Sequence, residues 1–144
     1  MFTQSWLFYA LLSAAAAALV GIFGKIGMRD VDSNLATTVR SIVMTLFLLG
    51  VCQFMGVWSK VGSLNGKAVA MIVLSGLAGA TSWLFYFKAI QVGTVAQVAP
   101  IDKLSMPLAV ILAVTLLGDR PTGVNWVGIG LITVGAVLAA MPGR

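Results

Sequence analysis

The most constraining feature of the sequence is the apolar stretch from Val95 to Leu117, whose first half holds charged residues. About 20 apolar residues suffice to cross the hydrocarbon core of a bilayer, so this stretch predicts a membrane-spanning helix. Asp102 and Lys103 lie within it, and an ionisable side chain at that depth is costly unless it faces a bundle interior or a wet cavity. They therefore indicate a functional site, with a structural ion pair as the alternative.

The same stretch contains two prolines, Pro100 and Pro107. Each removes a backbone donor, so we expect the carbonyls of Ala96 and Lys103 to become free acceptors. Irregular backbone at membrane depth is tolerated only where protein or water satisfies it, so this helix should line a cavity. Neighbouring residues of a helix point about 100° apart. Asp102 and Lys103 are therefore not expected to face the same spot.

The composition indicates an all-α polytopic membrane protein, because 60% of the 144 residues are hydrophobic and only 9% are charged. The chain has no histidine, which excludes a Ser-His-Asp set and a His-Glu-x-x-His zinc helix, and it has no phosphate-cradling glycine loop. We expect no enzyme activity, no cofactor and no metal. The basic residues are scattered at the ends of apolar segments, which is typical of interfacial anchors and not of a nucleic-acid partner.

Five membrane spans are expected, at about residues 6–26, 35–55, 68–87, 95–117 and 125–141. Small residues share one face in three of these helices and predict close helix packing. They are Ala10, Ala14, Ala17, Gly21 and Gly24 in the first span and Gly76, Gly79 and Ala80 in the third, and the stripe in the last span is Gly128, Ile132, Gly135 and Ala139. Residues 30–34 form a polar turn with candidate caps for the second span.

Two further side chains are candidates for substrate contact. Arg40 lies one to two turns inside the second span, where it either snorkels to the interface, pairs with Asp102 or holds an anionic group of the substrate. Trp83 belongs to an aromatic cluster with Phe85, Tyr86 and Phe87 that is typical of an interfacial belt. Because Trp83 lies deeper than its neighbours, its ring is also a candidate to stack on an apolar or cationic ligand.

Residues 87–140 resemble an EamA-type half of the drug/metabolite transporter superfamily. The most telling residues are Pro100 to Ser105 (PIDKLS), the span end at Leu117 to Arg120, and Gly128 with Gly135. Common members contain ten spans in two inverted halves, whereas this chain offers one half. Asp119 stands where glutamate is more usual. The related small multidrug resistance proteins use a glutamate in the first span, and no acid occupies that span here.

The resemblance implies a single domain, residues 1–144, which is one inverted-repeat half of a ten-span transporter and moves a small metabolite by alternating access. We expect the substrate near the midplane of the bilayer. The candidate substrate-binding residues are Asp102, Lys103, Trp83, Arg40, Gln97 and Ser105. The alternative function is a non-transporting accessory subunit of a larger membrane complex. The expected location is a bacterial inner membrane.

The charges that flank the spans are nearly balanced between the two sides of the membrane. Lys60, Lys67 and Arg120 fall on the side of the N-terminus, and Lys25, Arg29, Arg40, Lys88 and Arg144 fall on the other. A Lys/Arg bias normally fixes orientation, and without Lys25 and Arg40, which lie within span ends, the bias disappears. We therefore expect the chain to insert both ways and to form an antiparallel homodimer, with a homologous half as the alternative partner.

Overall fold

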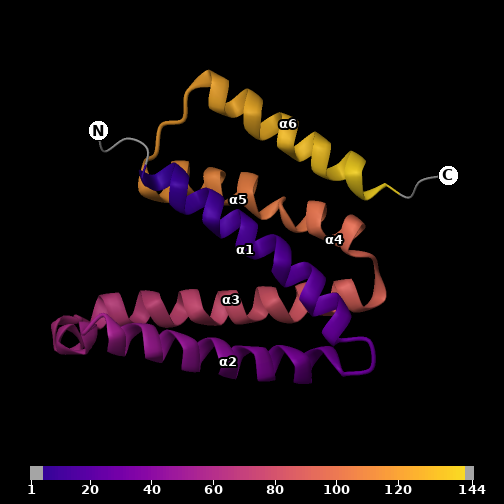
Figure 1. Cartoon of the computed structure of the whole chain (residues 1–144). Helices are drawn as coiled ribbons and strands as arrows, with labels where there is room; N and C mark the ends of the chain where they lie inside the picture. The colour runs from indigo at the N-terminus through magenta and orange to yellow at the C-terminus, as the bar shows by residue number, and fades with distance from the viewer. Residues whose placement is uncertain (1–4, 142–144) are drawn as a thin grey trace. The chain divides into compact units, whose positions relative to one another are not determined.

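A computed structural model describes residues 5–141, and these residues contain helices and no strand. The α-helices are α1 (Ser5–Gly27), α2 (Ser33–Phe54), α3 (Gly66–Val92), α4 (Val95–Asp102), α5 (Ser105–Leu112) and α6 (Gly123–Ala140) (Figure 1). A 3-10 helix, η1 (Val57–Ser63), follows α2, and a π-helix, η2 (Ala113–Leu117), continues α5. The prediction of an all-α chain is confirmed.

Five helical segments are long and apolar enough to cross a membrane, as predicted. They are Trp6–Gly27, Ser33–Phe54, Gly66–Val92, Val95–Leu117 and Gly123–Ala140. Most of their large apolar side chains are exposed, up to 94% for Phe54. Large exposed apolar surfaces on soluble proteins mark contacts with membranes or partners, and here they cover every span.

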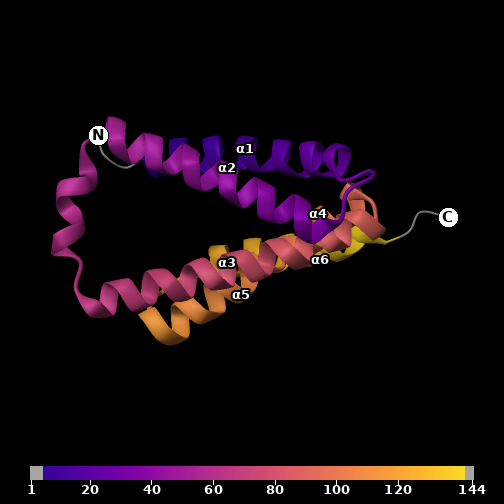
Figure 2. The same cartoon turned by 90° about the horizontal axis from the view of Figure 1, so that it is seen from below.

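The residues form two compact units. Unit 2 is Gly24–Gln91 and contains the last residues of α1, then α2, η1 and most of α3. Helices α2 and α3 run antiparallel, diverge toward η1 and converge at the opposite end (Figure 2). The buried side chains of unit 2 gather at that converging end, which we call the closed end. They are Met28, Ser33, Thr37, Phe87 and Ile90.

The closed end is shaped by a close contact at Gly24 of α1. A Cβ atom built at this position would overlap the ring of Phe87, which is only 2% exposed. At Gly27, one turn later, nothing lies within 4 Å of such an atom. The expectation that small residues of the first span permit close packing is thus confirmed at Gly24, and Gly21 is also buried, whereas Ala10, Ala14 and Ala17 are exposed.

Helix α2 begins where the polar turn was expected to cap it. Asp32 is the N-cap, and its Oδ1 atom accepts hydrogen bonds from the backbone N–H of Asn34 at 2.9 Å and of Leu35 at 3.1 Å. Helix α3 is longer than predicted, because it continues beyond Phe87 to Val92. Lys88 does not end the helix, and the chain leaves it only at Gly93 and at Thr94, the N-cap of α4.

Unit 1 comprises residues 5–23 and 92–141 of the described chain. Helix α6 returns antiparallel to α4 and α5 and packs against both (Figure 1). The turn before it starts at Gly118, whose φ of 76° is left-handed and favours glycine. The least exposed residues of α6 are Gly128, Ile129, Thr133, Ala136 and Ala140, so within the chain Gly135 and Ala139 lie outside the packed face.

Candidate functional site

The fourth span is broken at the place where its charges lie. Helix α4 ends at Asp102 and α5 starts at Ser105, and two tight backbone bonds close the turn between them. The N–H of Lys103 donates to the carbonyl of Pro100 at 3.1 Å, and the N–H of Leu104 donates to that of Ile101 at 3.0 Å. The span therefore consists of two short helices joined by a turn, and not of one continuous kinked helix.

One consequence expected from the prolines is wrong. Pro107 supplies no N–H to the carbonyl of Lys103, but that carbonyl accepts from the N–H of Met106 at 3.0 Å instead. The tighter i to i−3 geometry at the start of α5 occupies the acceptor. Pro100, inside α4, supplies no N–H to the carbonyl of Ala96.

Asp102 and Lys103 form an ion pair at this break. The Lys103 Nζ atom lies 3.3 Å from Asp102 Oδ2, and the side chains are 62% and 32% exposed respectively. The expectation that the two point to different places is wrong, because the helix ends at Asp102 and the long lysine side chain turns back from the cap position. At 1.5 Å per residue the pair lies about 10 Å along the span from Val95.

The other two candidates of unit 1 have different surroundings. The Oε1 atom of Gln97 accepts from Thr94 Oγ1 at 2.9 Å, and Thr94 Oγ1 accepts from the Gln97 N–H at 3.3 Å. This capping box starts α4, so the Gln97 side chain has a structural role. Ser105 is exposed at the start of α5, two residues after Lys103.

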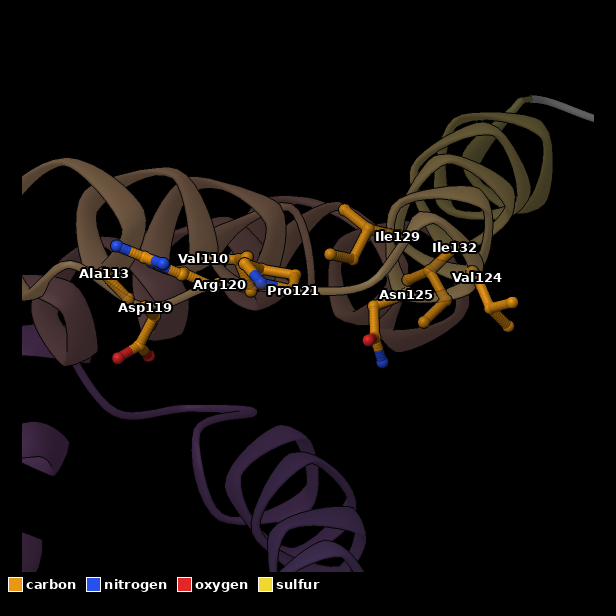
Figure 3. Close-up of a pocket in the computed structure, with 10 residues that line it drawn as sticks. Val110, Ala113, Asp119, Arg120, Pro121, Val124, Asn125, Ile129 and Ile132 are labelled. Atoms are coloured by element: carbon orange, nitrogen blue, oxygen red, sulfur yellow. The ribbon is translucent and has the colours of Figure 1, made fainter.

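An open groove of about 640 Å³ lies beside the turn between η2 and α6. Figure 3 shows Asp119 and Arg120 of the turn at one end and Ile129 and Ile132 of α6 at the other. Its other lining residues are Val110, Ala113, Pro121, Val124, Asn125 and Gly128. Asn125 Oδ1 already accepts from the Thr122 N–H at 2.8 Å, which caps α6. The sequence pattern did not indicate this groove.

In unit 2, Arg40 lies on an aromatic platform. Its Cζ atom is 3.6 Å from the centre of the Trp83 ring and 5.2 Å from that of Phe87. The two rings are themselves stacked, with centres 5.4 Å apart, and Tyr86 meets each of them edge to face. We call Arg40, Trp83, Tyr86 and Phe87 the arginine platform.

The platform changes the interpretation of both candidates. Trp83 lies nine residues before the end of α3, about 13 Å by helical rise, so Arg40 is held along the helix and does not extend to its end. The cation that stacks on Trp83 is a side chain of the chain itself. The belt interpretation is wrong for Phe87, which is buried.

The platform stabilises the charge of Arg40 only in part. An arginine at the centre of a membrane helix costs about 3 kcal/mol on insertion scales, and a desolvated cation–π contact contributes about 2 kcal/mol. Within unit 2, Arg40 makes no hydrogen bond and no ion pair. Its pairing with Asp102 stays a prediction.

Polar contacts that the sequence pattern did not indicate join the helices at the closed end. Lys25 Nζ donates to the carbonyl of Ile90 at 2.5 Å, and Gln91 Nε2 donates to that of Val31 at 3.0 Å. A cation at the C-terminus of α3 also interacts favourably with the helix dipole. The sequence places Lys25 at the end of the first span and does not indicate this contact, because the partner lies 65 residues away in the sequence.

The described residues contain five apolar spans, an ion pair at a break in the fourth span and a partly buried arginine in the second. These features are those of a polytopic membrane protein. Among residues 5–141 no three potential metal ligands lie together. The sequence profile described as the EamA-like transporter family matches residues 4–141, so the chain belongs to this family.

A relative from Sinorhizobium sp. is 41% identical over 139 residues, which cover 96% of this chain and 99% of that protein. That protein is named "Uncharacterized transporter in cobO 3'region". No solved structure matches the chain significantly. The chain is thus an integral membrane protein of a transporter family, as the resemblance implied.

Proposed function

We propose that the protein is a secondary transporter that moves a small polar metabolite across a bacterial inner membrane by alternating access. The observation that supports this proposal most is the exposed Asp102–Lys103 ion pair at the break in the fourth span. Discontinuous membrane helices with charges at the break are typical of transporter binding sites. The family membership and the name of the relative favour transport over the alternative of a non-transporting accessory subunit.

The ion pair suits a site that exchanges partners. An exposed pair contributes only about 0–1 kcal/mol, so a substrate that offers both an acceptor and a donor replaces it at little cost. Asp102 would accept from the substrate and Lys103 would donate to it. Ser105, exposed two residues further on, is within reach of the same surface as a hydrogen-bonding group.

The transporting unit in this proposal is a pair of five-span halves. Transporter folds often place the substrate between two inverted repeats, and an inverted second copy of this chain provides that symmetry. The near balance of Lys and Arg between the two sides of the membrane supports an antiparallel homodimer. A homologous half of fixed orientation is the alternative partner.

The test is uptake into liposomes that contain the purified protein. A thermal-unfolding screen in detergent against small carboxylates, phosphate esters, amino acids and amines first selects a transported compound. Asp102→Asn and Lys103→Gln should each lower its uptake by at least about tenfold, because each removes a charged hydrogen bond to the substrate. Lys60→Gln, outside the spans in η1, is the control and should retain wild-type uptake.

Two results would contradict the proposal. If both variants transport at the wild-type rate, the ion pair is structural. If no compound in the screen is taken up while the protein copurifies with a larger membrane complex, the accessory function is favoured.

A further inference from the structure

The charges of unit 2 are strongly unbalanced. Residues 24–91 contain six basic side chains (Lys25, Arg29, Arg40, Lys60, Lys67 and Lys88) and two acidic ones (Asp30 and Asp32). Both acids lie in the turn before α2, and Asp32 is occupied as its N-cap. Arg40 follows seven residues after the start of α2, about 10 Å along the helix, so neither acid of the unit serves it as a counter-ion.

The geometry of the platform leaves the hydrogen-bonding capacity of Arg40 unused. At 3.6 Å the Trp83 ring covers the guanidinium and interacts with its charge, but a ring offers no acceptor to the in-plane N–H groups. A guanidinium has five such donors in a planar fork. Within unit 2 none of them has a partner, and none is enclosed, since among residues 5–141 the buried side-chain polar atom that lacks a partner is Ser33 Oγ. The donors of Arg40 are therefore open to an acceptor from outside the unit.

We propose, on the basis of the transport function above, that the arginine platform is a binding site for an oxyanion, the carboxylate or phosphate group of the transported metabolite. Two oxygens of such a group match the fork of a guanidinium and form parallel charged hydrogen bonds. Trp83 and Phe87 hold the guanidinium so that its donors are oriented before the anion arrives. Lys25, Arg29 and Lys88 lie at the closed end, as the platform does, and they outnumber the two acids of the unit. This excess of positive charge favours an anion at the platform.

The same chemistry is offered by the phosphate of a lipid headgroup, and the experiment separates the two sources. Trp6, Trp58 and Trp126 are replaced by phenylalanine, which leaves Trp83 as the single indole fluorophore next to Arg40. The protein is placed in micelles of an uncharged maltoside detergent, which carries no phosphate, and inorganic phosphate or acetate is added. A saturable change in Trp83 emission is expected, whereas potassium chloride at equal ionic strength should cause none. A second set of micelles contains phosphatidylglycerol and no added phosphate or acetate. The emission change appearing there, with no further response to phosphate or acetate, would assign the site to a lipid and overturn the substrate assignment.

The variants test whether Arg40 is the binding group. Arg40→Gln should weaken phosphate binding by about tenfold or more, and Arg40→Lys, which keeps the charge but loses the fork, should weaken it in the same direction. Arg29→Gln, the same residue type in the exposed turn before α2, is the control and should bind as the wild type does. Equal binding in Arg40→Gln and wild type would overturn the proposal.

The binding assay is independent of transport. If the Asp102 and Lys103 variants lose uptake but still bind phosphate, the result supports an oxyanion site that is separate from the ion pair. Absence of any response to phosphate and acetate in the wild type, together with a Trp83 emission change in Asp102→Asn, would instead identify Asp102 as the acceptor of Arg40 and overturn the oxyanion site alone.

Discussion

The guanidinium carbon of Arg40 lies 3.6 Å from the centre of the Trp83 ring, although the two residues belong to different spans and are 43 positions apart. This contact joins α2 to α3 in the part of unit 2 where the helices converge. The energy of the contact is therefore expected to contribute to the stability of that helix pair.

A double-mutant cycle measures that energy. The free energy of unfolding in mixed micelles is determined for Arg40→Gln, Trp83→Leu and the double variant. We expect a coupling of about 1–2 kcal/mol, the range of a partly desolvated cation–π contact. The same cycle on Arg29 and Trp58, between which no contact is seen in the described residues, should be additive. A coupling near zero for Arg40 and Trp83 would contradict the stacked arrangement.

Gly24→Ala should lower the stability of the protein. The added Cβ atom would overlap the buried Phe87 ring, and overpacking of this kind costs about 1–3 kcal/mol. Gly27→Ala is the matched control, because nothing lies within 4 Å of its Cβ position. It should be neutral or stabilising by up to about 1 kcal/mol, since alanine is the better helix former. The penalty at Gly24 should shrink in a Phe87→Leu background, and an unchanged penalty there would exclude the ring as its cause.

Lys25→Met should loosen the closed end. Methionine keeps the apolar part of the side chain but removes the charged hydrogen bond to the Ile90 carbonyl, which is worth about 1.5–3 kcal/mol. Limited proteolysis after α3 and the free energy of unfolding both report this loss. Lys67→Met, at the end of α3 opposite to Ile90, should change stability by less than about 0.5 kcal/mol. Equal effects of the two variants would show that the Lys25 contact carries no stability.

Gly135→Leu tests the stripe of small residues on α6. Nothing lies within 4 Å of a Cβ atom at this position, so the substitution should leave the fold of one chain intact. If the stripe packs closely on a second copy, the larger side chain should lower the crosslinked fraction and the apparent size in detergent. Val134→Leu, an exposed neighbour on the same helix, is the control. Unchanged assembly of Gly135→Leu would show that the stripe faces lipid.

Reporters fused to the C-terminus test the predicted dual orientation. With Lys and Arg nearly balanced, reporters active on either side of the membrane should both give signal. Two additional lysines in η1 should remove one of the two signals. Two additional lysines in the turn before α6 should remove the same signal, because both segments lie on the same side of the membrane. A single orientation without a copurifying homologous partner would exclude the inverted pair and require a parallel assembly.

Much of the fold was predictable because its signals are local in the sequence. The five spans follow from apolar runs of sufficient length, Asp32 from cap chemistry, and the end of η2 from Gly118. The location of the break in the fourth span also follows from its prolines and charges. The geometry of the break was not predictable, because the hydrogen bonds of the turn at Lys103 depend on how α4 ends and how α5 begins.

The contacts between helices were not predictable for a different reason. The sequence leaves three possibilities open for Arg40, which are the interface, Asp102 and a substrate anion. Its neighbour in the structure is Trp83, whose ring the sequence suggests as a surface for an apolar or cationic ligand. Lys25 reaches Ile90 only because the end of α1 approaches the end of α3. Such pairs depend on the rotation and register of packed helices, and an apolar helix with several faces of similar composition specifies neither.

The turn between α4 and α5 gives the fourth span a mechanical property. A straight helix that bends in lipid must break bonds between its turns and leave polar groups without partners. At this turn the N–H groups of Lys103 and Leu104 already donate to carbonyls three residues earlier. The carbonyl of Lys103, to which Pro107 cannot donate, accepts from the N–H of Met106. A change in the angle between the two short helices at this turn would therefore expose few additional backbone groups. The charged pair lies at the turn, so such a change would move Asp102 and Lys103 directly.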